Sequence, residues 1–102
     1  RAVKVSGFDW DDGNWPKCGK HGVSRSEIES VIRETRFVVD DPNPGEKRLR
    51  TAGRVAGGRY VFVVFTLRPV EKETLIRPIS ARYMHVREIE FYEEEMARLE
   101  KR

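Results

Sequence analysis

Cysteine is almost absent from the sequence, because Cys18 is the only one. No disulfide can therefore form within the chain, which favours a reducing compartment, and we expect a cytoplasmic protein. No apolar stretch is long enough to span a bilayer or has the form of a secretory signal, so we expect no membrane contact. One cysteine and two histidines, His21 and His85, fall short of a zinc site. The glycines also lack nucleotide-binding spacing, and the sequence predicts no metal or other cofactor.

Acidic residues are absent from the middle of the chain. Residues 47–70 contain no Asp or Glu, and their basic residues are Lys47, Arg48, Arg50, Arg54, Arg59 and Arg68. This region is much more basic than the formal net charge of +3 suggests. Such a concentration of arginine favours an anionic and extended partner, of which nucleic acid is the foremost candidate.

Length and patterning indicate one small α+β domain. A chain of 102 residues can bury one core, so we expect a single domain over residues 1–102. The expected elements are a strand over 3–8, a short irregular helix ending near Gly22, a helix over 25–35, strands over 37–39, 47–56, 59–67 and 75–81, and a helix over 84–102. The fold class is therefore two N-terminal helices, an antiparallel sheet built largely from hairpins, and a C-terminal helix.

Local signals support these assignments. Ser24 and Glu27 have capping-box spacing at the start of the second helix. Residues 40–45 form a turn cluster, and residues 68–74 are expected to form a polar loop. The apolar run over 60–65 indicates a central strand that is buried on both faces. Pro78 argues for an edge or a local break in the next strand, and the stripe of the last helix includes His85 and Tyr92.

A row of arginines is the first candidate binding surface. Arg48, Arg50 and Arg54 share one face of the expected strand over 47–56, because strand residues two apart point the same way. Such a row of guanidinium groups can follow a phosphate backbone. Alternation on a solvated sheet face would give the same pattern. Neutral or acidic residues would solvate that face equally well, and none occurs, so phosphate contact is the favoured interpretation.

Arg82 and Tyr83 form a second candidate at the expected junction of strand and helix. Arginine suits bidentate phosphate geometry, and tyrosine supplies a hydroxyl donor. The alternative is structural, in which Arg82 pairs with a glutamate of the last helix, such as Glu88, and Tyr83 covers the core. The residues alone leave both interpretations open.

Lys20 and His21 can present a cation and a titratable imidazole at a helix end. Stabilisation of the helix dipole would explain the same two residues. Trp10 and Trp15 are candidates for base stacking, although tryptophan in so small a domain is more often part of the core. Cys18 has no neighbouring partner that would make it a nucleophile.

Several segments, in this order, resemble the BrnT toxins of type II toxin–antitoxin systems. The resemblance covers nearly the whole chain and is carried by Phe8-Asp9-Trp10-Asp11, Gly13-Asn14, Lys17-Cys18, Lys20-His21-Gly22-Val23-Ser24, Val64-Phe65-Thr66-Leu67 and Arg77-Pro78-Ile79-Ser80-Ala81-Arg82-Tyr83-Met84. It implies a RelE-like small ribonuclease fold and a toxin that cleaves RNA and inhibits translation. It also implies neutralisation by a BrnA-type antitoxin that carries a ribbon-helix-helix DNA-binding domain. DNA would then be contacted only through the antitoxin.

The resemblance further implies metal-independent cleavage, in which the RNA 2′-hydroxyl attacks the adjacent phosphorus. This reaction needs a proton acceptor, cations for the phosphorane and a donor for the leaving 5′-oxygen. The predicted roles are phosphorane stabilisation by Arg50 and Arg82, proton transfer by His21 or Lys20, RNA positioning by Arg48, Arg54 and Tyr83, and base stacking by Trp10. The competing hypothesis is a non-catalytic module of the same fold that binds RNA or the antitoxin.

Overall fold

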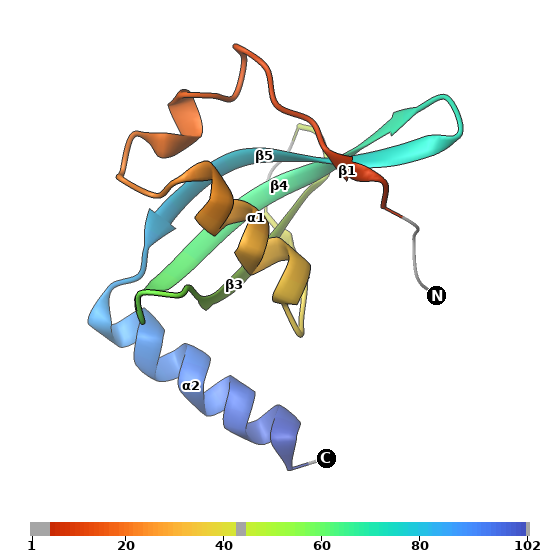
Figure 1. The fold of residues 1–102 in the computed structure, drawn as a ribbon. Coiled ribbons are helices and arrows are strands. Elements are labelled where there is room, and N and C mark those ends of the chain that lie inside the picture. The colour runs from red at the N-terminus through yellow and green to blue at the C-terminus, as the bar shows by residue number, and fades with distance from the viewer. Residues whose placement is uncertain (1–4, 43–44, 102) are drawn as a thin grey trace.

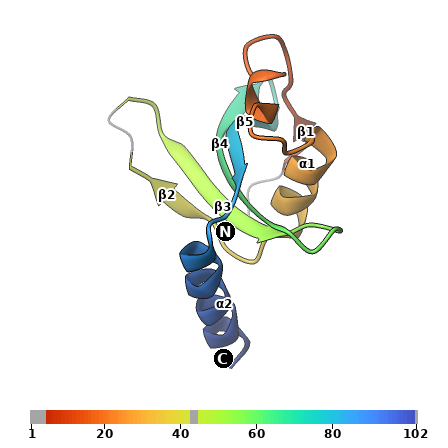
Figure 2. The same ribbon diagram turned by 90° about the vertical axis from the view of Figure 1, so that its left-hand side faces the viewer.

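The computed structural model of the chain describes residues 5–42 and 45–101 (Figure 1). One five-stranded sheet carries a helix on one face, and a second helix extends from the end of the sheet (Figures 1 and 2). The elements are β1 (Gly7–Phe8), the 3₁₀ helix η1 (Lys17–Gly19), α1 (Arg25–Glu34), β2 (Val39–Asp41), β3 (Arg48–Arg54), β4 (Tyr60–Val70), β5 (Glu73–Tyr83) and α2 (Val86–Glu100). The strand order is β1-β5-β4-β3-β2.

Helix α1 begins where the sequence predicted. The hydroxyl of Ser24 accepts the backbone N–H of Glu27 at 3.1 Å, and the carboxylate of Glu27 accepts the backbone N–H of Ser24 at 2.9 Å. The apolar side of α1, which includes Ile28, is buried against β3 and β4. A Cβ atom added to Gly53 of β3 would lie 3.4 Å from the side chain of Val31. Glycine at this position therefore lets the helix approach the sheet closely.

The segment between β1 and α1 contains one 3₁₀ turn and no α-helix, so the prediction of two N-terminal helices was wrong. Pro16 removes a backbone donor, and the glycines at 13 and 19 disfavour helix. Gly19 is also required for packing, since a Cβ there would lie 2.7 Å from the ring of Trp15. Gly22, near which the irregular helix was predicted to end, has a φ of 95° and makes a left-handed turn.

The sheet is mixed, which corrects the prediction of an antiparallel one. β1 runs parallel to β5 and places Phe8 beside Ile76, whereas the other strand pairs are antiparallel. The strand expected over 3–8 is observed only at residues 7–8, and residues 1–4 lie outside the described part of the chain. Partners so far apart in sequence have no turn between them that would reveal their pairing.

Strand β2 lies two residues later than predicted, at Val39–Asp41 instead of residues 37–39. It includes two aspartates that had been assigned to a turn. Asp41 pairs with Arg50 at 3.6 Å, and Asp40 pairs with Lys47 at 3.8 Å. Aspartate has a low strand propensity, but these cross-strand charge pairs stabilise β2 at Asp40 and Asp41.

The polar loop expected over 68–74 is instead the end of a long hairpin. β4 and β5 each contain 11 residues, and pairing continues to Val70 and Glu73. Glu71 takes the left-handed turn conformation with a φ of 56°. The end of this hairpin projects from the rest of the sheet (Figure 1), so its polar side chains need no apolar partner.

Strand β4 is central, as predicted, because it lies between β3 and β5. The register of β4 with β5 shifts between Val64 and Phe65, opposite Pro78, which confirms the predicted local break. Burial on both faces is incomplete, however. Phe62, which lies on the face opposite α1, is only half-buried, whereas Val61 and Val63 on the α1 side are fully buried.

Helix α2 does not cover that second face. No residue in α2 is fully buried, and the side chains of Val86 and Phe91 are 71% and 65% exposed. Tyr92 provides contact with the sheet end through the ring of Tyr60, with centroids 5.8 Å apart. His85 is the N-cap residue of α2 and does not belong to its apolar stripe, which corrects the prediction. Neither this helix nor any other in the described ranges is long and apolar enough to cross a membrane.

The packing of α1 predicts a large cost for truncating Ile28, which is 0% exposed. We expect Ile28→Ala to lower the free energy of unfolding by about 2–5 kcal/mol, since it removes buried methyl groups and leaves a cavity. Val86→Ala, at an exposed position, should change it by less than about 0.5 kcal/mol. Urea unfolding measures both variants. Equal effects would show that the core does not lie between α1 and the sheet.

Candidate functional site

The sheet face opposite α1, called the open face below, carries the predicted row of arginines. Gly53 faces α1, so the even-numbered residues of β3 point away from that helix. These residues include Arg48, Arg50 and Arg54. Strand pairing places Phe62 opposite Ala52 of β3 and opposite Arg82 of β5, which adds Phe62 and Arg82 to the same face.

Two of the predicted residues meet around an aromatic ring on the open face. The guanidinium carbon of Arg82 lies 5.1 Å from the centroid of Phe62, and that of Arg50 lies 6.0 Å from it. All three residues line a groove of about 880 Å³ between the open face and α2, called the α2 groove below. Its far wall includes Arg87 and Phe91. An aromatic ring flanked by two cations can stack a base and hold its phosphate.

Arg82 also makes the ion pair that the structural interpretation required. Its two terminal nitrogens donate to the two carboxylate oxygens of Glu88, each at 2.8 Å. Glu88 additionally accepts the backbone N–H of His85 at 2.9 Å, so the same carboxylate caps α2. Hydrogen bonds from Arg82 and His85 lower the pKa of Glu88 from 4.5 to about 2. The two side chains remain 35% and 38% exposed, so a phosphate can still approach the guanidinium.

The other arginines of the row differ in their partners. Arg50 faces Asp41 at 3.6 Å, which partly neutralises it. Arg54 donates to the carbonyl of Gly58 at 3.3 Å and therefore supports the hairpin turn. Arg48 has no ion pair within the described ranges, and its Nε is buried without a hydrogen-bond partner there.

Tyr83 points to the α1 side of the sheet. Its hydroxyl donates to the carboxylate of Glu27 at 3.1 Å and lies 3.4 Å from the carbonyl oxygen of Gly22. The guanidinium carbon of Arg59 lies 3.4 Å from the ring centroid. Burial and the Glu27 carboxylate raise the pKa of Tyr83, which keeps the phenol protonated as a donor. The ring also packs against the core, as its structural interpretation required.

The predicted site is therefore divided between two faces of β5. Lys20 and His21 are exposed in the turn before Gly22, on the side to which Tyr83 points. Arg82 points to the opposite side, because neighbouring strand residues face opposite ways. The structure brings Arg50 and Arg82 together and places the proposed proton-transfer residues with Tyr83. The two groups of residues come near each other only at the end of β5, where Arg82 and Tyr83 are consecutive.

Trp10 has well-defined structural partners. Its indole N–H donates to Glu29 at 2.8 Å, and its ring meets that of Trp15 edge to face at 5.5 Å. Arg25 lies over both rings, at 5.1 and 5.7 Å from their centroids. Both indoles pack against the core. Base stacking by Trp10 stays a prediction, and it would require Arg25 to share or leave the ring.

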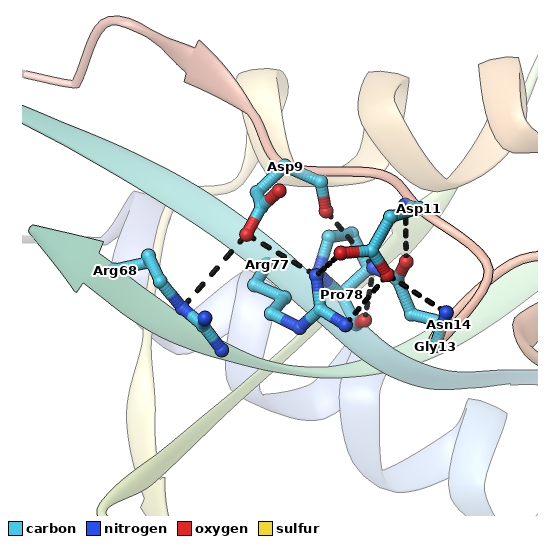
Figure 3. A network of polar contacts seen from close by, with 7 residues as sticks. All are labelled: Asp9, Asp11, Gly13, Asn14, Arg68, Arg77 and Pro78. Carbon is cyan, nitrogen blue, oxygen red and sulfur yellow. Dashed lines mark hydrogen bonds and ion pairs between the residues drawn. The ribbon is translucent and has the colours of Figure 1, made fainter. Parts of the chain in front are cut away.

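A polar network that sequence reasoning missed fixes the segment after β1 (Figure 3). Arg77 of β5 donates to Asp9 at 3.1 Å and to both carboxylate oxygens of Asp11, at 3.1 and 2.9 Å. Asn14, which is buried, donates to the carbonyls of Asp9 and Pro78 at 2.9 and 3.0 Å. Arg77 holds the pKa of Asp11 below its usual range. Only the parallel register of β1 with β5 brings these residues together.

Cys18 does not have the surroundings of a reactive thiol. The Cys18 side chain is buried, and burial raises the pKa of its thiol, which disfavours the reactive thiolate. Across residues 5–42 and 45–101, no group of three His, Cys, Asp or Glu side chains could hold a metal ion.

A protein-family model described as "Ribonuclease toxin, BrnT, of type II toxin-antitoxin system" matches residues 10–88. The match runs from Trp10 to Glu88 and so includes Arg50 and Arg82. A search of curated proteins finds no match.

The ion pair between Arg82 and Glu88 predicts a pH-dependent stability. The pKa of Glu88 is lowered from 4.5 to about 2, so its stabilisation is present above pH 4.5 and is lost as the pH falls toward 2. Glu88→Gln removes the charge and keeps an amide that can cap α2. We expect its urea midpoint to lie below that of the native chain at neutral pH, with the gap closing as the pH falls below 4.5.

Glu90→Gln, at an exposed position of the same helix, is the matched control and should change the midpoint little at neutral pH. A gap between Glu88→Gln and the native chain that stays constant with pH would contradict the ion-pair account.

Proposed function

Since the chain belongs to the BrnT family of ribonuclease toxins of type II toxin–antitoxin systems, we propose that it is an endoribonuclease that acts on RNA at the open face. The observation that carries this proposal is the meeting of Arg50 and Arg82 around Phe62. Two guanidinium groups can hold one phosphate from two sides, and the ring between them can stack an adjacent base.

In the proposed reaction the RNA 2′-oxygen attacks the adjacent phosphorus and the bond to the 5′-oxygen breaks. The products are a 2′,3′-cyclic phosphate and a 5′-hydroxyl, so the 2′-hydroxyl loses a proton and the leaving oxygen gains one. Arg50 and Arg82 would stabilise the additional charge of the phosphorane, which is the contribution that a metal ion makes in other nucleases. We therefore propose cleavage without a metal.

The proton-transfer residues remain His21 or Lys20 in this proposal. Glu88 lies closer to Arg82, but a pKa of about 2 makes its carboxylate a weak proton acceptor at neutral pH. Because His21 and Arg82 lie on different sides of β5, His21 or Lys20 would have to reach a phosphate held by Arg50 and Arg82 around the end of that strand. There, Tyr83 could also contact the RNA.

We propose further that cleavage of messenger RNA inhibits translation in the cytoplasm and that a BrnA-type antitoxin neutralises the chain. Val86 and Phe91 are exposed apolar residues of α2, and Phe91 lines the α2 groove beside the arginines. Exposed apolar groups next to charged ones favour a protein partner that covers both. The ribbon-helix-helix domain of that antitoxin would then provide any DNA contact. We also propose that the fold is RelE-like, supported by α1 on one face of the antiparallel β3, β4 and β5.

Ribonuclease activity is tested with a labelled RNA in EDTA and purified chain freed of any partner. We expect native protein to cleave it and Arg82→Ala, checked for folding by circular dichroism, to lose about 100-fold or more in rate, as on loss of one charge-stabilising donor. Glu88→Gln should keep its activity, because it frees the guanidinium of Arg82. Arg98→Ala, on the exposed side of α2, should match the native rate.

If Glu88→Gln loses as much activity as Arg82→Ala, Arg82 acts by holding α2 and not by binding phosphate. If neither native nor variant chain cleaves RNA, the assay is repeated with ribosomes. RNA that stays intact there would favour the non-catalytic binding module.

A further inference from the structure

A second cavity opens at the other end of the open face from the α2 groove. It has a volume of about 190 Å³ and is called the Arg48 pocket below. Its charged lining residues are Lys17, Glu46, Arg48, Arg68 and Arg77, which come from η1, the turn before β3, and strands β3, β4 and β5. The hydroxyl-bearing Thr66 adds a polar group. Most ligand pockets for drug-sized molecules are larger, at about 300–1,000 Å³, so this one suits a smaller group.

Arg48 is the lining residue that indicates an anion-binding site. Its Nε is buried and finds no hydrogen-bond partner in the part of the chain that the structure describes. Buried donors are nearly always paired. An anion in the pocket would provide the hydrogen bond that Nε lacks.

The remaining cations of the pocket differ in how much of their charge is available. Arg77 is only 15% exposed and is neutralised by Asp9 and Asp11 (Figure 3). Arg68 lies 3.8 Å from Asp9, too far for a strong ion pair, and Lys17 is exposed with no ion pair within residues 5–42 and 45–101. The cations that are not neutralised by a close carboxylate are therefore Arg48, Lys17 and Arg68.

The Arg77 network also gives the pocket a fixed wall. Gly13 packs so closely that a Cβ atom there would lie 2.8 Å from a terminal nitrogen of Arg77. The hydroxyl of Thr66 donates to the carbonyl of Lys47 at 3.0 Å, which holds the start of β3 against β4. A wall held by these contacts does not need to reorganise when an anion enters, which favours binding.

We propose that the Arg48 pocket binds a phosphate group of the RNA that flanks the scissile phosphate, with Arg48, Lys17 and Arg68 as its ligands. This inference rests on the proposed function and extends its substrate contacts. Arg48 and Arg50 are two residues apart on one face of β3, which places them about 6.6 Å apart along the strand. Bound RNA would run along β3, from the Arg48 pocket to the α2 groove. Cations that converge from several elements suit a phosphate better than a planar carboxylate.

Inorganic phosphate is the first probe, titrated into isotope-labelled chain at constant ionic strength with chloride as the balancing anion. We expect saturable amide shifts at Lys17, Arg48 and Thr66. Arg48→Gln should weaken phosphate binding by about tenfold or more, the range for one charge-assisted hydrogen bond. Arg48→Lys keeps the charge but loses the planar guanidinium, so its phosphate affinity should lie between those of the native chain and Arg48→Gln. Arg98→Gln should bind phosphate as the native chain does. No saturable shift, or equal binding by Arg48→Gln, would overturn the proposal.

A 2′-O-methyl RNA, which cannot undergo 2′-oxygen attack, distinguishes an RNA phosphate from a free phosphate ion. We expect Arg48→Gln to weaken its binding and to reduce the salt dependence by about one phosphate contact. Unchanged RNA affinity in a variant that has lost phosphate binding would overturn the assignment to RNA.

Neither measurement depends on cleavage, so the two proposals fail separately. A chain that binds phosphate and RNA through Arg48 but cleaves nothing would contradict the proposed function alone. A chain that cleaves RNA but shows no phosphate binding at Arg48 would contradict the pocket alone.

Discussion

Helix α1 is buried against one side of the sheet, and this packing determines which side chains face away from the core. Ile28 and its neighbours pack against Val61 and Val63, and this single layer forms the core. Because side chains alternate along a strand, whatever α1 covers on one face leaves the intervening residues on the other. In β3 those residues include Arg48, Arg50 and Arg54, and in β4 they include Phe62. A one-sided core thus produces the cationic open face.

The polar contacts divide the remaining cations into structural and available groups. Arg77 is held by Asp9 and Asp11, and Arg54 by the hairpin turn, so both support the fold. Arg82 belongs to both groups, because it caps the junction with α2 through Glu88 and still lines the α2 groove. The Nε of Arg48 is buried and has no hydrogen-bond partner within the described residues. The arginines of the basic stretch therefore have different roles, since some stabilise the fold and others are free to bind an anion.

Elements defined by neighbouring residues could be predicted from the sequence. The capping box at Ser24 located the start of α1, and the alternation of residues located the arginine face of β3. The parallel pairing of β1 with β5 could not, since it joins residues far apart in sequence and creates the Arg77 network. The cross-strand partners of Asp40 and Asp41 could not be predicted for the same reason, so β2 was placed two residues too early.

The opposite directions of Arg82 and Tyr83 could have been predicted from the sequence if the strand had been extended to residue 83. The strand was predicted to stop at residue 81, with Arg82 and Tyr83 in the following junction. In the structure β5 continues through Tyr83, so these two consecutive side chains point to opposite faces. His21 then lies with Tyr83, away from Arg50 and Arg82.

A crystal structure with an uncleavable 2′-deoxy-substituted RNA would show where the chain binds RNA. We expect the strand to lie over the open face, with a phosphate between Arg50 and Arg82 and a base against Phe62. RNA bound on the α1 side, beside Tyr83 and His21 with the open face empty, would show that the open face is not the RNA site.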